Sequence, residues 1–265
     1  MILITGASGH LSSLVTQKAR EIGLPIITAS RASGSDRRID FDQPETLNFA
    51  DVDTLFLTSA GYAEDDVVIK RHGNVIAAAR AQGVKHIIYT SLSYTGDHLG
   101  FALAHRWTEQ KLRESGMAWT ILRNGLYAEL IGTLAAPREG QITAPFGSAG
   151  ISAVAREDLA DAAITVLRDV TAHVNTCYEL SGVKPFSIPD LAQRIGIPYE
   201  PTNFAAERTM LDHLQLLPFQ PPMLMSIYAS AMSGFLETGT SDLMTLVPRP
   251  KDALMVACSS AEQRT

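Results

Sequence analysis

The sequence opens on a glycine turn of a kind that binds phosphate groups. The apolar run Ile2–Ile4 leads into Gly6 and Gly9, and apolar residues recur at helical spacing from Leu11 onward. A strand, a glycine turn and a helix in this order point free backbone N–H groups, and the positive end of a helix dipole, at the space above the sheet edge. The ligand that this arrangement favours is a pyrophosphate.

The spacing of the turn is Gly6-x-x-Gly9-x-x-Ser12, where the usual dinucleotide motif has glycine or alanine in the third position. That position serves close packing of helix on strand. We therefore expect the helix to lie slightly further out, or the Ser12 hydroxyl to bond locally. An ordinary strand-to-helix turn is the alternative, and the strand-turn-helix context disfavours it.

Arg31 indicates the choice of coenzyme. It follows an expected second strand, Pro25–Ser30, at the point where an NAD site usually has an acidic residue. An arginine suits the dianionic 2′-phosphate of NADPH instead, so the sequence predicts NADPH as the cofactor. The alternative is a solvated loop arginine, because Arg37 and Arg38 carry similar charge nearby.

Strands and helices alternate after this point, which predicts an α/β fold with a doubly wound parallel sheet, the Rossmann arrangement. Parallel sheets bind ligands at the carboxyl ends of their strands, so residues at the strand ends are predicted to contact the coenzyme. Asp40 and Phe41 are predicted either to line the adenine site or to form an ordinary turn. His72 is predicted to be a buried core histidine. Further strands are expected over 37–42, 52–61, 84–91 and 117–127, and helices over 44–50, 66–82 and 102–115. Further contacts with the coenzyme are expected at Ser59, Ala60, Gly61 and Ser91.

The helix over 102–115 lacks the tyrosine and lysine pair of short-chain reductases. None of the seven tyrosines has a lysine four residues later, and the helix offers His105 and Glu109 instead. His105 is a candidate catalytic acid, because an ordinary histidine pKa suits proton transfer near neutral pH. Alternatively, His105 and Glu109 pair with each other at i, i+4 spacing. Tyr94 and Tyr127 are candidates for an acceptor pocket, or else buried core residues.

Six sequence blocks resemble the NmrA-like branch of the atypical short-chain dehydrogenases, in particular NADPH-dependent quinone oxidoreductases and triphenylmethane dye reductases. The blocks are ITGASGHL, FLTSAG, GNVIAAARAQGVKHIIYTSLS, HRWTE, TILRNGLY and AREDLADAA, and they fall within residues 1–170. The resemblance implies a Rossmann domain that binds NADPH through the glycine loop and the arginine after the second strand, and it implies that an Asn-Gly-x-Tyr stretch, with Tyr127 also a catalytic candidate, lies beside the nicotinamide. These residues are Gly6, Ser8, Gly9, His10, Leu11, Arg31, Asn124, Gly125, Leu126 and Tyr127.

The regular pattern ends after residue 128, which predicts an NADP-binding Rossmann domain over 1–128 and a mostly helical, substrate-binding lobe over 129–265. Part of the lobe, about 151–180, is expected to return to the sheet. Ser187 is predicted to cap a helix, and Asp158 to be an N-terminal helix charge. The methionine-rich helix expected over 223–236 is core, a pocket lining, or a face for a homodimer.

Composition excludes several classes of function. The chain has 265 residues, 19% of them charged, and a formal net charge of −6, so there is no basic surface for nucleic acid. Two cysteines without metal-ligand spacing predict neither a disulfide framework nor a metal site. No apolar run is long enough for a membrane span, so we expect a soluble, cytoplasmic protein.

Two functions remain after these exclusions. The first is an NADPH-dependent reductase that transfers hydride directly to a quinone-like or other small aromatic acceptor; a biosynthetic reductase with one dedicated substrate would share this chemistry. The second is a non-catalytic NADP(H)-binding redox sensor that passes its signal to a protein partner. The missing tyrosine and lysine pair fits both.

Overall fold

The computed structural model describes residues 1–263 and has a seven-stranded sheet in the order β3-β2-β1-β4-β5-β6-β7. The pairs β3/β2, β2/β1, β1/β4 and β4/β5 are parallel. Strand order reverses at β1, so the ends of β1 and β4 form the crevice where such sheets bind ligands. The strands are β1 (Ile2–Thr5), β2 (Ile26–Ser30), β3 (Arg37–Arg38), β4 (Thr54–Leu57), β5 (His86–Leu92), β6 (Ala118–Asn124) and β7 (Thr176–Leu180).

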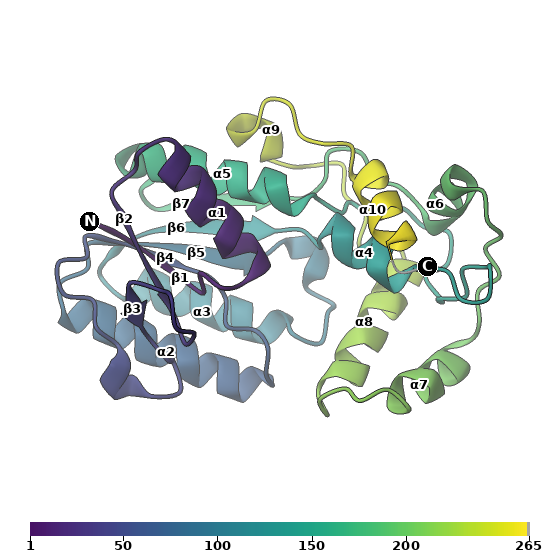
Figure 1. Cartoon of the computed structure of the whole chain (residues 1–265), viewed down its shortest axis with the longest axis horizontal. Helices are drawn as coiled ribbons and strands as arrows, with labels where there is room; N and C mark the ends of the chain where they lie inside the picture. The colour runs from purple at the N-terminus through teal and green to yellow at the C-terminus, as the bar shows by residue number, and fades with distance from the viewer. Residues whose placement is uncertain (264–265) are drawn as a thin grey trace. The chain divides into compact units, whose positions relative to one another are not determined.

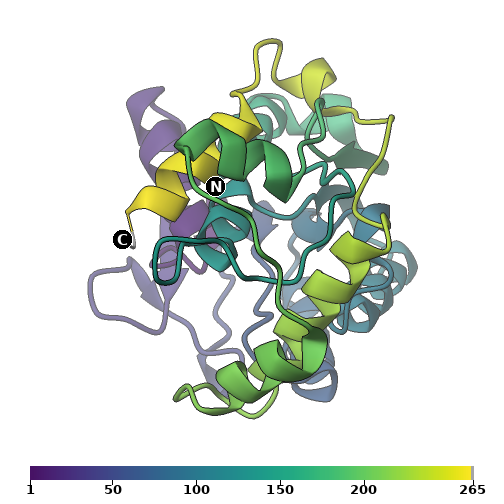
Figure 2. The same ribbon diagram turned by 90° about the vertical axis from the view of Figure 1, so that its right-hand side faces the viewer.

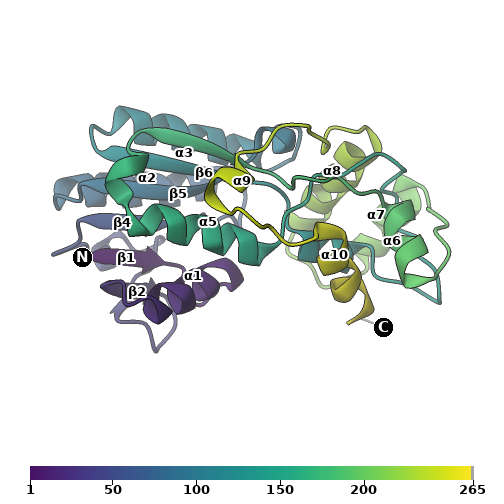
Figure 3. The same cartoon turned by 90° about the horizontal axis from the view of Figure 1, so that it is seen from above.

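Helices cover both faces of the sheet, which buries its central strands. Leu3, Leu55 and Ile87 are fully buried, as expected for apolar runs in a parallel sheet covered on two sides. On one face, α1 and α5 are joined by an ion pair between Lys18 and Asp161 (2.7 Å), and α2 and α3 lie on the other (Figures 1 and 3). The helices of this layer are α1 (His10–Glu21), α2 (Asp65–Ala81), α3 (Ala102–Glu114) and α5 (Arg156–Arg168). The predicted doubly wound Rossmann fold is confirmed.

The chain divides into two compact units. The first unit comprises Met1–Ser91, Leu103–Arg123 and Leu159–Tyr178, and holds most of the sheet. The second comprises Leu92–Ala102, Asn124–Asp158 and the chain from Glu179 onward. The boundary expected at residue 128 stays a prediction.

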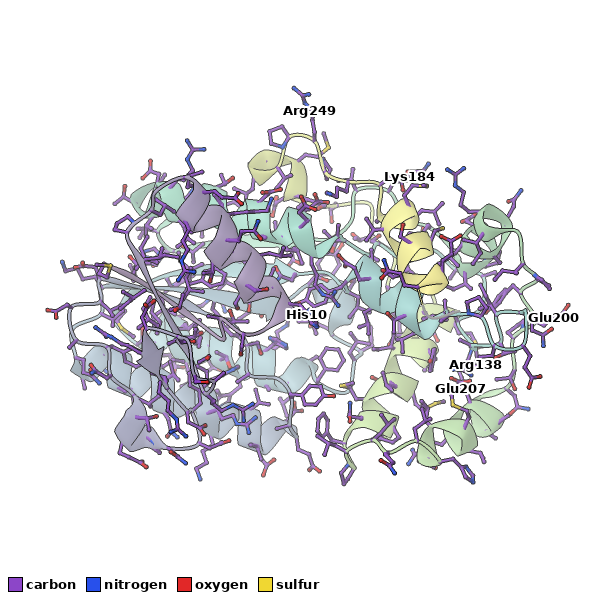
Figure 4. All side chains as sticks on the ribbon, viewed as in Figure 1. His10, Arg138, Lys184, Glu200, Glu207 and Arg249 are labelled. Atoms are coloured by element: carbon purple, nitrogen blue, oxygen red, sulfur yellow. The ribbon has the colours of Figure 1, made fainter. Side chains whose placement is uncertain are left out.

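The second unit has its own apolar core, formed largely by helices. Within it α10 packs against α4 so closely that a Cβ on Gly132 would lie 2.1 Å from the Ala257 carbonyl oxygen (Figure 2). Arg138 and Glu207 form a bidentate ion pair (2.8 and 3.0 Å; Figure 4). The helices of this unit are α4 (Ala128–Leu134), α6 (Ile188–Ile195), α7 (Phe204–Asp212), α8 (Gln220–Met232), α9 (Leu243–Leu246) and α10 (Ala253–Glu262).

Several details of this unit test the predictions. Ser187 caps α6 in a reciprocal capping box with Asp190, as predicted. The methionine-rich α8 buries Ile227 and Tyr228 in the core, and its exposed end carries Met232. Asp158 lies in the first turn of α5 and also accepts the Lys251 N–H (2.9 Å), so it does more than offset the helix dipole.

Some predicted elements are shorter than expected. The third strand, expected over 37–42, covers only Arg37–Arg38, because the Asp40 N–H bonds the Thr46 hydroxyl (2.9 Å) and turns the chain away. The helix expected over 44–50 is one 3-10 turn, Pro44–Thr46. Within 151–180, expected to return to the sheet, Ile151 and Val154 form only isolated bridges, and β7 is the strand that joins the sheet. None of the helices within residues 1–263 is both long and apolar enough to cross a lipid bilayer.

Candidate active site

The glycine turn and the start of α1 form a cradle for an anion. Gly6 has φ +62°, which favours glycine, and a Cβ on Gly9 would lie 3.2 Å from the Gly6 carbonyl oxygen. No side chain caps α1, and its first turn contains no acidic residue. The first N–H groups of α1 therefore remain available to a ligand, and His10 stands at this helix start (Figure 4). A pyrophosphate fits this donor set.

Ser12 uses its hydroxyl differently from what we expected. It is fully buried, and its Oγ lies 2.6 Å from Oγ1 of Thr58, just past the end of β4. The bond is not local, because 46 residues separate Ser12 from Thr58. It joins α1 to the exit of β4 and so connects the two sides of the crevice.

The exit of β4 is held by three side chains from three elements. The N–H of Thr58 donates to Oγ1 of Thr5 (3.0 Å), that of Ser59 to Oγ1 of Thr90 (3.0 Å), and that of Ala60 to Nε2 of His72 (3.0 Å). These N–H groups are thus unavailable to a coenzyme, to which the segment can offer only carbonyl groups and side chains. The Ser59 Oγ is buried and has no hydrogen-bond partner among the described residues.

Arg71 binds the carbonyl group of Ala60, on the other side of the residue from the N–H that His72 accepts. Its Nη1 donates to the Ala60 carbonyl oxygen (3.3 Å), and its guanidinium binds both carboxylate oxygens of Asp42 (2.8 and 2.6 Å). The hydrogen bonds from Arg71 hold the pKa of Asp42 below its ordinary value. Consecutive residues of α2, Arg71 and His72, therefore bind the carbonyl and the N–H of the same residue, Ala60, at the exit of β4. His72 is buried, as predicted, but it also positions this segment.

The predicted contacts for the adenosine part of the coenzyme lie in the same unit. Arg31 is exposed directly after β2, while Asp40 and Phe41 are half-buried beyond β3. Asp40 accepts the Asp42 N–H (3.0 Å), which is a turn-forming bond. The Arg37 guanidinium donates to the carbonyl oxygens of Asn48 and Ala50. It is therefore held in place and is not a fully solvated loop arginine.

His105 lies in the first turns of α3 and is half-buried. Its Nδ1 is 2.9 Å from the hydroxyl of the fully buried Tyr89. Burial, assisted by the nearby Arg106 charge, lowers the pKa of His105 to about 4. His105 is therefore neutral at pH 7, unlike the ordinary histidine acid that the sequence predicts.

Glu109 does not pair with His105. Its carboxylate is 1% exposed and accepts hydrogen bonds from Arg123 (2.6 and 2.8 Å), Arg106 (2.9 Å) and the Ser91 hydroxyl (2.7 Å). Arg113 adds a weaker ion pair at 3.4 Å. The predicted i, i+4 pair is replaced by a carboxylate among three arginines. The Ser91 hydroxyl, expected at the coenzyme, is engaged with Glu109.

The predicted segment Asn124–Tyr127 lies in the second unit, as does Tyr94, whereas Ser8, Leu11 and Gly61 lie in the first. The Asn124 carbonyl accepts the Ser93 N–H (2.9 Å), and the Gly125 N–H donates to the Leu180 carbonyl (3.0 Å). Leu126 is held by the Val154 N–H (2.9 Å) and, like Tyr127, is half-buried. This segment therefore has a fixed backbone.

The two candidate pocket tyrosines differ in environment. Tyr127 stands at the N-terminus of α4 under the Arg156 guanidinium, 4.9 Å from its ring centroid, and burial raises its pKa. It is thus a protonated phenol rather than an activated one. The Tyr94 hydroxyl bonds the hydroxyls of Thr238 and Thr240 (3.0 Å to Thr240), although the side chain is 40% exposed.

The sequence analysis did not predict four residues that hold the site together. They are Tyr89, Arg71, Arg123 and Thr5, the last through its hydroxyl. Each acts through a contact between residues far apart in the chain, such as 51 residues between Thr5 and Phe56. A local signal is the adjacency of Arg71 and His72 on α2. That signal alone does not identify a strand exit as their partner.

The fold and this cradle define a dinucleotide-binding α/β protein, and comparison with known proteins identifies its family. Residues 6–170 match the family described as NAD(P)H-binding. Quinone oxidoreductase 2 of Escherichia coli is 34% identical over 212 residues, 74% of this chain and 73% of that protein. An NmrA-like family domain-containing oxidoreductase of Aspergillus flavus is 35% identical over 147 residues, 48% of each chain.

A solved structure of an NADP(H)-bound reductase is similar to this chain over nearly its full length. The crystal structure of Citrobacter sp. triphenylmethane reductase complexed with NADP(H) has a TM-score of 0.88 and 29% identity, and covers 98% of this chain and 99% of its own. The chain belongs to the NAD(P)H-binding family. The predicted NmrA-like resemblance, the nicotinamide coenzyme and the oxidoreductase class are confirmed.

Proposed function

We propose that the chain uses NADPH to reduce small conjugated aromatic acceptors of the quinone type, without a tyrosine and lysine pair. The observation that carries the proposal is the state of α3. Glu109 stands at the position of the usual lysine, and its carboxylate is bound by arginine side chains. His105 stands at the position of the usual tyrosine and is neutral at pH 7. A reaction that needs no strong acid fits such a site.

A conjugated acceptor meets this condition, because the negative charge that it gains is spread over the ring system. The bound coenzyme supplies a hydride. The chain supplies placement and exclusion of water, which account for much of the rate in such a transfer. The α1 cradle would hold the pyrophosphate, and the fixed segment Asn124–Tyr127 would lie at the nicotinamide, with the Tyr94 and Tyr127 rings as acceptor contacts.

The test is NADPH oxidation with a panel of simple quinones, followed by the loss of NADPH absorbance, alongside calorimetric titration of NADP⁺ and NADPH. We expect turnover with at least one quinone. Tight binding of both coenzyme forms without turnover on any acceptor would contradict the proposal and favour the redox sensor. Relatives named quinone oxidoreductase and triphenylmethane reductase support the choice of panel.

Replacing Arg31 is expected to weaken NADPH binding selectively. Arg31→Ala removes an exposed cation from the end of β2, where we place the 2′-phosphate. A charge-assisted contact of this kind corresponds to about tenfold to a hundredfold in Kd. NADH binding should change little. Titration of both coenzymes measures the effect, and Arg38→Ala, an exposed arginine on β3, is the control. Equal loss for NADH and NADPH would place the phosphate elsewhere.

A further inference from the structure

Tyr89 is a buried polar residue directly beneath the candidate catalytic histidine. It belongs to β5, is fully buried, and its hydroxyl lies 2.9 Å from Nδ1 of His105. The His72 ring contacts Tyr89 edge-on, with 5.5 Å between ring centroids and 75° between planes. The tyrosine is thus fixed on one side by the core and meets His105 on the other.

The hydrogen-bond partners of Tyr89 and His105 indicate which atom carries each proton. Burial raises the pKa of Tyr89 well above its ordinary value, so the phenol keeps its proton. The Tyr89 hydroxyl lies 2.9 Å from Nδ1 of His105, and the hydroxyls of Ser59 and Thr108 are further neighbours of the phenol. An unprotonated imidazole nitrogen is a stronger acceptor than the hydroxyl of Ser59 or Thr108, so we assign Tyr89 as the donor and Nδ1 as the acceptor. A neutral imidazole has one N–H, which must then be on Nε2.

We propose that Tyr89 is a positioning residue that fixes His105 in the Nε2–H tautomer, so that His105 meets the acceptor as a neutral hydrogen-bond donor and not as an imidazolium acid. This inference rests on the proposed function. The acceptor gains one hydride, that is, two electrons and a hydrogen nucleus. Nε2–H donates a hydrogen bond to the acceptor oxygen as negative charge develops there. The oxyanion then takes its proton from water, and His105 keeps its own.

Burial and the Arg106 charge favour this neutral state of His105, and the Glu109 carboxylate opposes it. Arg106 and Glu109 lie on its own helix, Tyr89 on β5 and His72 on α2. Burial lowers the pKa of His72 to about 3, so it is also neutral at pH 7. None of these residues gives a charge change at His105 between about pH 5.5 and 8. The rate should therefore be insensitive to pH in that range.

Nitrogen-15 NMR of histidine-labelled protein tests the tautomer without any need for activity. We expect the Nε2–H tautomer in the wild type and a mixture of tautomers in Tyr89→Phe, which keeps the ring and loses the hydroxyl. Tyr178→Phe is a matched control, because it breaks a second tyrosine-histidine bond, to His173 (2.7 Å), away from α3. It should leave the His105 signals unchanged. A His105 tautomer that is the same in wild type and Tyr89→Phe would overturn the proposal.

Kinetics with 1,4-benzoquinone test the neutral donor. His105→Phe should lower kcat about a hundredfold, the cost of one lost oxyanion donor. His105→Gln keeps an N–H near Nε2 and should stay within about tenfold of the wild type, with the same flat pH profile. Tyr89→Phe should lower kcat about tenfold, the equivalent of one hydrogen bond, with the KM for NADPH unchanged.

Three results would contradict the neutral donor. The first is a wild-type rate that changes with pH through an apparent pKa near the ordinary histidine value. The second is a His105→Gln variant as inactive as His105→Phe. The third is a Tyr89→Phe enzyme with the kcat of the wild type. Absence of any turnover in the wild type would instead count against the proposed function. The NMR result would still decide the tautomer.

Discussion

Glu109→Gln should lower the free energy of unfolding by about 3 kcal/mol, because it leaves three arginines around a neutral amide. The carboxylate is 1% exposed and joins α3 to the ends of β5 and β6 through Ser91 and Arg123. The arginine side chains are 22–40% exposed, which lets water reach them and keeps the cost at the lower end for a broken buried pair. Urea unfolding followed by circular dichroism measures the change.

Glu114→Gln is the matched control for this variant. Glu114 is on the same helix and pairs with Lys111 (2.8 Å), but both side chains are nearly half exposed. Exposed pairs of this kind contribute at most about 1 kcal/mol. Equal unfolding midpoints for the two variants would mean that the buried carboxylate is not the centre of the arginine cluster.

The same group gives an acid dependence with a definite sign. Burial alone would raise the pKa of Glu109, but hydrogen bonds from Arg123 and Ser91 outweigh it and hold the pKa below the ordinary 4.5. A depressed carboxyl pKa stabilises the fold above the unfolded-state pKa, and this stability is lost as the pH falls through the folded-state value. The difference between wild type and Glu109→Gln should therefore be constant near neutral pH and shrink below about pH 4.5.

The sequence predicted the parts of the site that depend on local order. A glycine turn, the helix after it and the arginine after β2 are each specified by residues close together in the chain. The strand and helix alternation then fixes which ends share an edge, because parallel strands place all their carboxyl ends on the same side. The core position of His72 could also be predicted, since it lies on the apolar face of its helix.

The sequence could not predict which polar groups already have partners. Ser91 and Glu109 each look available in the sequence, yet they bind each other across 18 residues. The Tyr94 phenol bonds Thr238, 144 residues away. A residue type gives the chemistry that a group can perform, but only the fold decides whether a neighbour has taken its lone pairs or its proton. The same holds for the pKa of His105, which burial sets.

Gly182→Ala is expected to have the largest effect of any single methyl group added to the second unit. A Cβ at Gly182, just after β7, would lie 1.9 Å from the Ala153 carbonyl oxygen and 2.9 Å from its carbonyl carbon. Both are backbone atoms that cannot rotate away, and the Gly182 N–H already donates to the Ser152 carbonyl (2.9 Å). Overpacking usually costs about 1–3 kcal/mol, and a backbone clash this short should reach or exceed the upper figure.

The clash should also reduce turnover, because it acts on the backbone beside the Asn124–Tyr127 segment. A Cβ on Gly125 would lie 3.1 Å from Ser181 Cα, so that glycine is already packed against the strand end that Gly182 follows. We therefore expect a graded series in urea midpoint and in quinone reduction. Gly239→Ala, with no atom within 4 Å of its Cβ, should match the wild type; Gly125→Ala should be intermediate and Gly182→Ala lowest. A Gly182→Ala protein as stable as Gly239→Ala would show that the two backbones lie further apart than described, and that this contact does not fix the segment.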